Sequence, residues 1–288
     1  MPPLPPPTPV RACLFDMDGL LLDTEDLYTL CTNTLLAAYG KPSLPWSIKA
    51  QLQGRPGPDA TRIFFEWAQL PCSREEYLAK QSALQREHFP STKPLPGVEE
   101  LLRKLGGAQE RGKVELALAT SSHKANFELK TQFTGDLFEP FRLESRVLGD
   151  DPRVPKGRGK PAPDIYLLAL ETVNARRRAA GEKHDILPGE CLVFEDSVPG
   201  VEAGRRAGMQ VIWCPHPELL REYAGREEQV LAGLMGEHKE IEQKNEEIGV
   251  ATQGGDVQKG APGEIGDGWG VLLKTLDGFP YERFGIEV

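Results

Sequence analysis

The sequence predicts an α/β fold: a doubly wound (Rossmann-like) parallel sheet with a small inserted α-helical domain. Short apolar runs ended by polar residues are typical of strands buried on both faces, as in parallel sheets. From Pro94 onward such runs alternate with helical patterns, which predicts right-handed βαβ units. Residues 24–92 show helical patterns and no convincing strand, and they follow the first predicted strand.

Reactive side chains follow three of the apolar runs directly: Asp16 and Asp18 after residues 12–15, Thr120 and Ser121 after 114–119, and Glu195 and Asp196 after 191–194. Lys160 stands just before another helical pattern. In doubly wound sheets, ligands bind outside the carboxyl ends of the strands. We therefore expect carboxylates, a hydroxyl and an ammonium to meet in one crevice.

Three helices are predicted in the inserted part, over residues 24–39, 59–70 and 73–88. Asp23 or Thr24 can cap the first helix, and Ser73 with Glu76 fits a capping box that opens the third. The apolar face of the first helix is expected to consist of Leu27, Leu30, Thr34, Leu35 and Ala38.

The α/β part is predicted to contain strands at 12–15, 114–119, 141–148, 191–194 and 209–213, with helices at 98–105, 124–133, 163–174 and 198–207. We therefore expect a core of residues 11–23 and 93–288 and a helical domain of residues 24–92. Residues 1–10 are proline-rich and are expected to be a disordered tail. Residues 237–267 are rich in Gly, Glu and Gln and are expected to be a disordered insertion, after which 269–287 dock back on the core.

Composition excludes several classes of protein. A net charge of −9 argues against general nucleic-acid binding, which depends on cationic surface. No apolar stretch approaches the roughly 18 residues of a membrane span, and no secretory signal is recognisable, so a cytoplasmic protein is expected. The five cysteines are scattered without metal-ligand spacing and are expected to be free. We expect a monomer whose partner is a small metabolite.

The gathered residues suit phosphoryl transfer. Two like unit charges 4 Å apart repel by roughly 4 kcal/mol at an effective dielectric of 20. A carboxylate that approaches a phosphate dianion meets about twice this repulsion. A divalent cation and a lysine are therefore close to required. Asp16 and Asp196 offer the hard oxygen ligands that Mg²⁺ prefers. Lys160 can neutralise the phosphate, and Thr120 can donate its hydroxyl to a phosphoryl oxygen.

Asp18 lies two residues beyond Asp16 and can reach the leaving-group oxygen if Gly19 forms a turn. It is the natural acid for the departing alcohol and then the base for water. The alternative for Asp-x-Asp-Gly is a calcium loop. That loop needs further oxygen ligands at regular offsets, where this chain has Leu20 to Leu22.

Four motifs resemble those of the haloacid dehalogenase superfamily, in the same order: residues 15–19, 118–122, 159–164 and 193–200. The helical insertion matches the small cap of subfamily I, placed between the first and second motifs. The resemblance covers roughly residues 11–225. It implies an α/β core of the haloacid dehalogenase type that carries a helical cap.

The resemblance also implies a role for each site residue. Asp16 would be the nucleophile and Asp18 the general acid/base, while Thr120 and Lys160 would hold the phosphoryl group. Mg²⁺ would be held by Asp16, the backbone carbonyl of Asp18 and Asp196, with Glu195 beside or just behind it. An acid at the position of Asp18 favours phosphate chemistry over dehalogenation.

Within the superfamily, residues 148–152, 120–122 and 191–200 are similar to the pseudouridine-5′-phosphatase-like phosphatases and their fungal members. Residues 153–158, the proline-rich start and the 237–267 insertion depart from that pattern. Substrate selection is expected in the cap segment 53–57. Arg55 is either a substrate contact there or a surface residue, and Ser121 is expected to contact substrate beside Thr120.

The resulting hypothesis is a Mg²⁺-dependent phosphomonoesterase that acts on a small phosphorylated metabolite through an aspartyl-phosphate. Its substrate would be nucleotide-like, such as pseudouridine 5′-phosphate, or a sugar phosphate. One alternative is a sugar phosphomutase of the β-phosphoglucomutase type, which the motifs resemble equally. The other is a non-catalytic regulatory protein that keeps the fold, although such a protein would be expected to lack Asp16 or Asp18.

Overall fold

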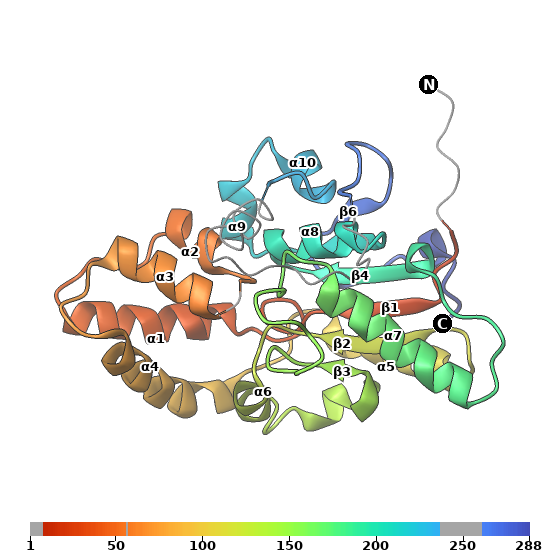
Figure 1. Cartoon of the computed structure of the whole chain (residues 1–288), viewed down its shortest axis with the longest axis horizontal. Helices are drawn as coiled ribbons and strands as arrows, with labels where there is room; N and C mark the ends of the chain where they lie inside the picture. Colours follow the sequence, from red (N-terminus) through yellow and green to blue (C-terminus); the bar gives the residue numbers. More distant parts are fainter. Residues whose placement is uncertain (1–7, 56, 237–260) are drawn as a thin grey trace.

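The computed structural model describes residues 8–55, 57–236 and 261–288. Its centre is a parallel sheet of six strands in the order β3-β2-β1-β4-β5-β6, which confirms the predicted fold class (Figure 1). The strands are β1 (Ala12–Phe15), β2 (Glu115–Ala119), β3 (Arg146–Val147), β4 (Cys191–Glu195), β5 (Gln210–Trp213) and β6 (Gly270–Leu272). The order reverses at β1, which pairs with β2 on one side and with β4 on the other.

The described part of the chain contains ten α-helices. Four lie in the inserted part: α1 (Glu25–Ala38), α2 (Trp46–Leu52), α3 (Gly57–Ala68) and α4 (Arg74–His88). The others are α5 (Val98–Glu110), α6 (Lys124–Lys130), α7 (Asp164–Ala179), α8 (Val198–Arg206), α9 (Pro217–Glu222) and α10 (Glu227–Leu231).

Two apolar clusters cover the two faces of the sheet. The alternate residues Cys13 and Phe15 of β1 pack with α5 and with the C-terminal residues, whereas Ala12 and Leu14 pack with α7 and α8. Successive side chains of a strand point to opposite faces, so both faces of β1 must be apolar to be covered in this way. This is why the strand reads as a continuous apolar run.

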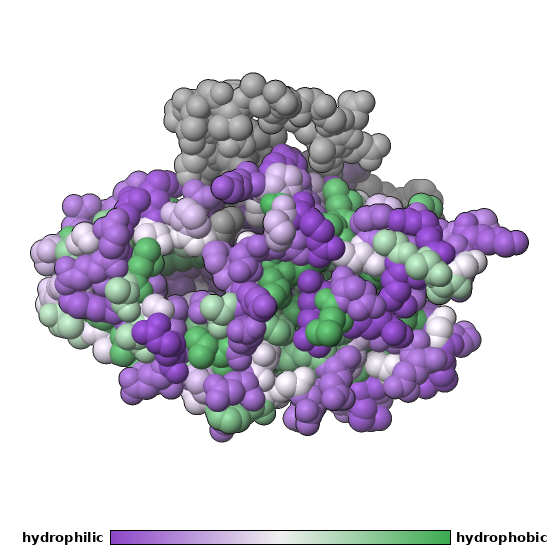
Figure 2. All heavy atoms as spheres, turned by 60° about the horizontal axis from the view of Figure 1, so that its bottom comes forward, coloured by the Kyte–Doolittle hydropathy of each residue, from purple (hydrophilic) through white to green (hydrophobic). Residues whose placement is uncertain are grey.

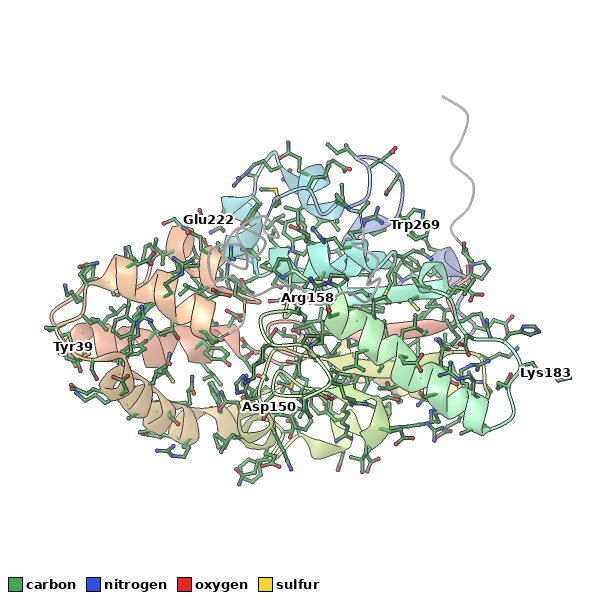
Figure 3. The ribbon with its side chains drawn as sticks, viewed as in Figure 1. Tyr39, Asp150, Arg158, Lys183, Glu222 and Trp269 are labelled. Carbon is green, nitrogen blue, oxygen red and sulfur yellow. The ribbon has the colours of Figure 1, made fainter. Side chains whose placement is uncertain are left out.

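Helices α1–α4 lie together beyond one end of the sheet, with Tyr39 at their tip and Lys183 at the opposite end of the molecule (Figure 3). They have an apolar cluster of their own, which includes Leu36, Phe64 and Tyr77. Ser73 caps α4 as predicted, since its Oγ accepts the backbone N–H of Glu76 at 3.1 Å. Ala50 of α2 instead packs in the cluster of the sheet, and the domain boundary at residues 24–92 stays a prediction.

The structure corrects some local predictions. The strand expected at 141–148 is reduced to β3, because residues 143–145 form a 3₁₀ turn. Helix α2 had no predicted counterpart. The face predicted for α1 is wrong except at Leu35: Leu30 is 45% exposed, whereas Cys31 and Leu36, which were not predicted, are buried beside Leu35. The helix is turned so that this second row packs towards α4, with which α1 makes extensive contact.

The two predicted disordered segments are only partly described, since 1–7 and 237–260 lie outside the described residues. Within the first, Val10 is buried and donates its backbone N–H to the carbonyl of Phe284 at 2.9 Å. Within the second, Asp267 accepts a hydrogen bond from the side chain of Arg205 on α8. Val10 and Asp267 therefore belong to the folded part of the chain, because each forms a hydrogen bond with another residue of that part.

Residues 269–287 return to the core as predicted. Strand β6 extends the sheet beside β5, and Phe279 packs between Phe194 and Phe284 with ring centroids 5.2 and 5.4 Å away. No helix in the described ranges is long and apolar enough to cross a bilayer. The face in Figure 2 is mostly hydrophilic, with hydrophobic side chains in small separate groups.

Replacing Phe279 by alanine tests how much this return stabilises the fold. Phe279 is 4% exposed, so Phe279→Ala is expected to lower the free energy of unfolding by about 3–5 kcal/mol. Urea denaturation followed by circular dichroism measures the loss. Phe133 is 74% exposed, and Phe133→Ala should change stability by less than about 0.5 kcal/mol. Equal effects of the two substitutions would contradict the packing described for the C-terminal segment.

Candidate active site

The site lies where the order of the strands reverses. Strand β1 ends at Phe15 and β4 at Glu195, and the two run side by side, with Leu14 opposite Val193. The carboxyl ends of neighbouring parallel strands meet at one edge, and a reversal of strand order opens a crevice there. Asp16 and Asp196, which are 180 positions apart in the sequence, are thus brought together as predicted.

Lys160 joins the two strands through its buried ammonium. Its Nζ pairs with Asp16, lies 2.7 Å from Oε1 of Glu195 and donates to the carbonyl of Ala119 at 3.1 Å. Only 1% of Lys160 is exposed. Tyr166 on α7 donates its hydroxyl to the same Glu195 oxygen at 2.5 Å. Lys160 is thus fixed by three partners from three strand ends.

Asp16, Glu195 and Asp196 form an acidic cluster in which one oxygen from each lies within 4.8 Å of the others. All three are buried, and one lysine cannot neutralise three carboxylates. Burial raises the pKa of Asp16 to about 7 against the effect of Lys160, with Glu195 adding to the rise. Burial and the neighbouring Asp16 raise the pKa of Asp196 well above its usual value. Carboxylate oxygens crowded in this way fit a hard divalent cation.

Asp18 has a different environment, and its side chain is outside the acidic cluster. Its Oδ1 pairs with Nζ of Lys130 at 2.5 Å, and its Oδ2 accepts the Ser122 hydroxyl at 2.6 Å. Burial alone would raise the pKa of Asp18, but the Lys130 ammonium and the hydrogen bonds from Lys130 and Ser122 outweigh it and lower the pKa. Lys130 also donates to the hydroxyl of Tyr28 at 2.8 Å. Asp18 is therefore ionised in this structure.

Thr120 and Ser121 lie at the end of β2, as predicted, and both line the same cavity as Asp16 and Asp18. Thr120 is fully buried, and its Oγ1 accepts the backbone N–H of Ser122 at 3.1 Å. The Ser121 hydroxyl donates to the carbonyl of Gly54 at 3.4 Å, which links the core to the inserted helices. Thr120 and Ser121 thus place two hydroxyl groups at the wall of the cavity.

Two glycines leave the space that the carboxylates of the acidic cluster occupy. Gly19 has φ +75, and a Cβ there would lie 2.2 Å from Oδ2 of Asp196. A Cβ on Gly200, in the first turn of α8, would lie 1.9 Å from Oε1 of Glu195. Any larger residue at either position would push one of these carboxylates out of its place.

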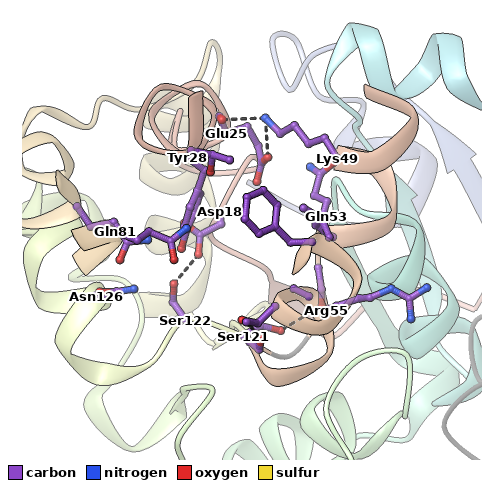
Figure 4. Close-up of a pocket in the computed structure, with 18 of the residues that line it drawn as sticks. Asp18, Glu25, Tyr28, Lys49, Gln53, Arg55, Gln81, Ser121, Ser122 and Asn126 are labelled. Carbon is purple, nitrogen blue, oxygen red and sulfur yellow. Dashed lines mark hydrogen bonds and ion pairs between the residues drawn. The ribbon is translucent and has the colours of Figure 1, made fainter. Parts of the chain in front are cut away.

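A cavity of about 480 Å³ lies between these residues and the inserted helices. Its core side contains Asp16, Thr120 and Asp196, and its far side is formed by α1, α3 and α4. Figure 4 shows Gln81 and Asn126 on one side of the cavity, with Lys49 and Gln53 on the other. The volume is within the range of about 300–1,000 Å³ that is usual for small-molecule sites.

The cationic groups of the cap side are Lys49 and Arg55 among the described lining residues. Lys49 pairs with the Glu25 carboxylate at 3.0 Å and donates to the Glu25 carbonyl at 2.8 Å and to the Thr29 hydroxyl at 2.6 Å. Arg55 donates from Nε to the Gln51 carbonyl, and its guanidinium points away from the cavity (Figure 4). A substrate contact for Arg55 stays a prediction.

Two contributors to the site had no sequence prediction, Lys130 and Tyr166, whereas Gln53 belongs to the segment 53–57 that was expected to select the substrate but was not expected to contact Asp196. Gln53 donates from Nε2 to Oδ2 of Asp196. A signal for Lys130 exists, because it stands three positions after buried Phe127 and thus on the buried face of its helix. Tyr166 belongs to none of the four motifs, and only its contact with Glu195 reveals it.

The fold and the site define a doubly wound α/β protein with an aspartate after β1 and an acidic pair after β4. The family model "haloacid dehalogenase-like hydrolase" matches residues 10–208, so the chain belongs to that family. The strand order and the positions of Asp16, Lys160 and Asp196 agree with the resemblance found in the sequence.

Particular relatives can be named. The chain is 44% identical over 227 residues to a Saccharomyces cerevisiae protein named as a probable pseudouridine-5′-phosphatase, covering 79% of this chain and 91% of that one. It is 39% identical to (DL)-glycerol-3-phosphatase 1 of Arabidopsis thaliana, covering 77% and 70%. A solved HAD hydrolase of family IA from Entamoeba histolytica shares the fold, with a TM-score of 0.59 at 20% identity over 96% and 98% of the two chains.

Gly19→Ala tests whether the close approach of Gly19 to Asp196 lowers stability in addition to the strain of a positive φ. Gly40 has a similar φ of +65 with open space around its Cβ, so Gly40→Ala carries the backbone strain alone. We expect Gly19→Ala to lower the free energy of unfolding by about 1–3 kcal/mol more than Gly40→Ala does, because the new methyl group overlaps a buried carboxylate. Urea denaturation measures both, and equal losses would show that Asp196 is free to move aside.

Proposed function

We propose that this hydrolase is a Mg²⁺-dependent phosphomonoesterase that acts on a small phosphorylated metabolite. The observation that carries the proposal is the pairing of Asp16 with buried Lys160 inside a cluster of three buried carboxylates, beside the cavity that Asp16 and Asp196 line. The names of the relatives, pseudouridine-5′-phosphatase and glycerol-3-phosphatase, support phosphate ester hydrolysis. A cytoplasmic location and a monomeric state stay predictions from composition.

Mg²⁺ would be held by Asp16, Asp196 and the backbone carbonyl of Asp18, with Glu195 behind them, and would supply positive charge to the phosphoryl oxygens. Glu195 suits the outer position, because its Oε1 already contacts Lys160 and Tyr166 and its Oε2 accepts the Ser197 hydroxyl at 3.0 Å. The crowded negative charge that raises the pKa of Asp16 is what a divalent cation relieves.

The reaction follows from the positions of the chain's own groups. An Asp16 carboxylate oxygen attacks phosphorus, the bond from phosphorus to the ester oxygen breaks, and the departing oxygen takes a proton from Asp18. Asp18 then removes a proton from water, whose oxygen attacks the phosphorus of the aspartyl-phosphate. The bond between phosphorus and Asp16 breaks, so inorganic phosphate leaves and the Asp16 carboxylate is restored. Thr120 and Lys160 hold the phosphoryl oxygens throughout.

The pairing of Asp18 with Lys130 favours the ionised form of Asp18, which affects both proton transfers. With its pKa lowered, Asp18 is ionised in this structure, which is the form that activates water. To protonate the leaving oxygen it must first take up a proton. An incoming phosphate dianion favours this uptake, because a neighbouring negative charge raises the pKa of a carboxyl group.

The cap side of the cavity favours a phosphatase over a phosphomutase. A mutase must hold a second phosphate, which requires cations there. The Lys49 ammonium already has three oxygen partners, one of which is the Glu25 carboxylate, and the Arg55 guanidinium points away from the cavity (Figure 4). A carboxylate next to that lysine would repel a second phosphate. The regulatory alternative is disfavoured because Asp16 and Asp18 are both present, each with its own lysine.

Release of inorganic phosphate from a panel of phosphomonoesters tests the proposal. The panel contains pseudouridine 5′-phosphate, nucleoside monophosphates, FMN, glycerol phosphate and hexose phosphates, each with Mg²⁺ and with EDTA. Asp16→Asn should lower the rate by about three orders of magnitude or more, because the nucleophile is lost. Asp277→Asn, on an exposed loop, is the control and should keep the wild-type rate.

Substantial turnover by Asp16→Asn would rule out Asp16 as the nucleophile. Phosphate release that EDTA leaves unchanged would rule out the metal. No release from any phosphomonoester, followed by isomerisation of a hexose phosphate once a sugar bisphosphate is added, would establish the mutase instead.

Lys130→Met tests the assignment of Asp18. Loss of the buried ammonium should raise the pKa of Asp18, since burial then acts unopposed. A step that needs ionised Asp18 fails as the pH falls through that pKa, so the acidic limb of the kcat profile should move to higher pH. Lys124→Met, an exposed change on the same helix, should leave the profile in place. An acidic limb that does not move in Lys130→Met would remove Asp18 from the rate-determining proton transfer.

A further inference from the structure

Gln53 is the residue that joins the end of α2 to the acidic cluster. It is only 7% exposed, lines the cavity and donates from Nε2 to Oδ2 of Asp196. The orientation of its amide follows from electrostatics, because an amide oxygen in that place would face a carboxylate oxygen and be repelled. The Nε2 group therefore faces Asp196, and Oε1 faces the other way.

The Oε1 atom of Gln53 is buried and has no hydrogen-bond partner among the described residues. A buried polar atom left in this state costs about 1–3 kcal/mol. Such atoms are uncommon in folded proteins and call for a missing partner. Because Gln53 lines a cavity, a bound molecule can supply that partner, and the partner must be a hydrogen-bond donor.

The rest of the cap side indicates what kind of donor this is. Its polar lining includes the neutral side chains of Gln81, Gln85 and Thr61, and Asn126 faces the cavity from the core (Figure 4). The ammonium of Lys49 is saturated by its own partners. Neutral amides and hydroxyls suit uncharged hydroxyl groups, which both donate and accept hydrogen bonds. The cavity thus fits a phosphate ester with a neutral, hydroxylated carbon skeleton.

We propose that Gln53 is a specificity-determining residue whose Oε1 accepts a hydrogen bond from a hydroxyl group on the substrate's carbon skeleton. One amide bonds Asp196 with its nitrogen and the substrate with its oxygen, so the recognised hydroxyl lies close to the phosphoryl site, on a carbon near the ester oxygen. Polyol and sugar phosphates carry such a hydroxyl, and simple alkyl phosphates do not. This inference rests on the proposed phosphatase function and defines its substrate class.

The test compares glycerol 3-phosphate with propyl phosphate, which has the same three-carbon chain without hydroxyl groups. The wild-type protein should show kcat/KM at least ~10-fold higher for glycerol 3-phosphate, because propyl phosphate leaves Oε1 unpartnered. Gln53→Met keeps the length of the side chain and removes both polar atoms. It should lower this selectivity ratio by ~10-fold.

Gln51→Met is the matched control, since Gln51 lies on the same helix and is exposed, with its amide donating to the Ser47 carbonyl at 2.8 Å. Its selectivity ratio should equal that of wild type. If the panel shows a nucleotide to be the better substrate, uridine 5′-phosphate and its 2′,3′-dideoxy analogue replace the pair. Thermal melting confirms that each variant is folded.

Three results would overturn the proposal. The first is a wild-type protein that hydrolyses both esters of the pair equally well, which needs no variant. The second is an unchanged ratio in Gln53→Met. The third is an equal loss of kcat/KM on both esters in Gln53→Met, together with a higher Mg²⁺ concentration for half-maximal activity. That result would show that Gln53 acts on the metal site and not on the substrate. A wild-type protein that releases phosphate from no ester would instead refute the proposed phosphatase function itself.

Discussion

The site depends on the two ion pairs and the hydrogen bond that the buried ammonium of Lys160 forms. The ammonium balances Asp16 and Glu195 at the ends of two adjacent strands and bonds the carbonyl at the end of a third. Removing one partner of such a buried pair commonly costs about 3–5 kcal/mol, because the other charge is left uncompensated. The adjacency of β1, β2 and β4 is therefore coupled to the charge balance of Asp16 and Glu195.

Two carboxylates only two residues apart have opposite environments. Asp16 lies among other buried acids, which together with burial raise its pKa, whereas Asp18 faces Lys130, which lowers it. Groups whose environments push their pKa values apart are suited to different roles in one reaction. Here the crowded carboxylate suits metal binding and attack on phosphorus, and the lysine-paired one suits proton transfer.

The inserted helices complete the site with neutral polar groups. Lys49 is occupied by Glu25, and Gln53 reaches from α2 to Asp196. Under the proposed function, the core would contact the phosphate, while the helices would contact the remainder of the substrate.

The sequence by itself determined the parallel sheet and the residues at its carboxyl edge, because apolar runs and the motifs after them are local patterns. It placed β1, β2, β4 and β5 within one or two residues. Only the tertiary structure decided which face of α1 is buried, that Lys130 pairs with Asp18 and that Gln53 meets Asp196. The last two contacts join residues 112 and 143 positions apart, and no local pattern encodes such pairings. They arise when packing of the helices onto the sheet brings distant segments together.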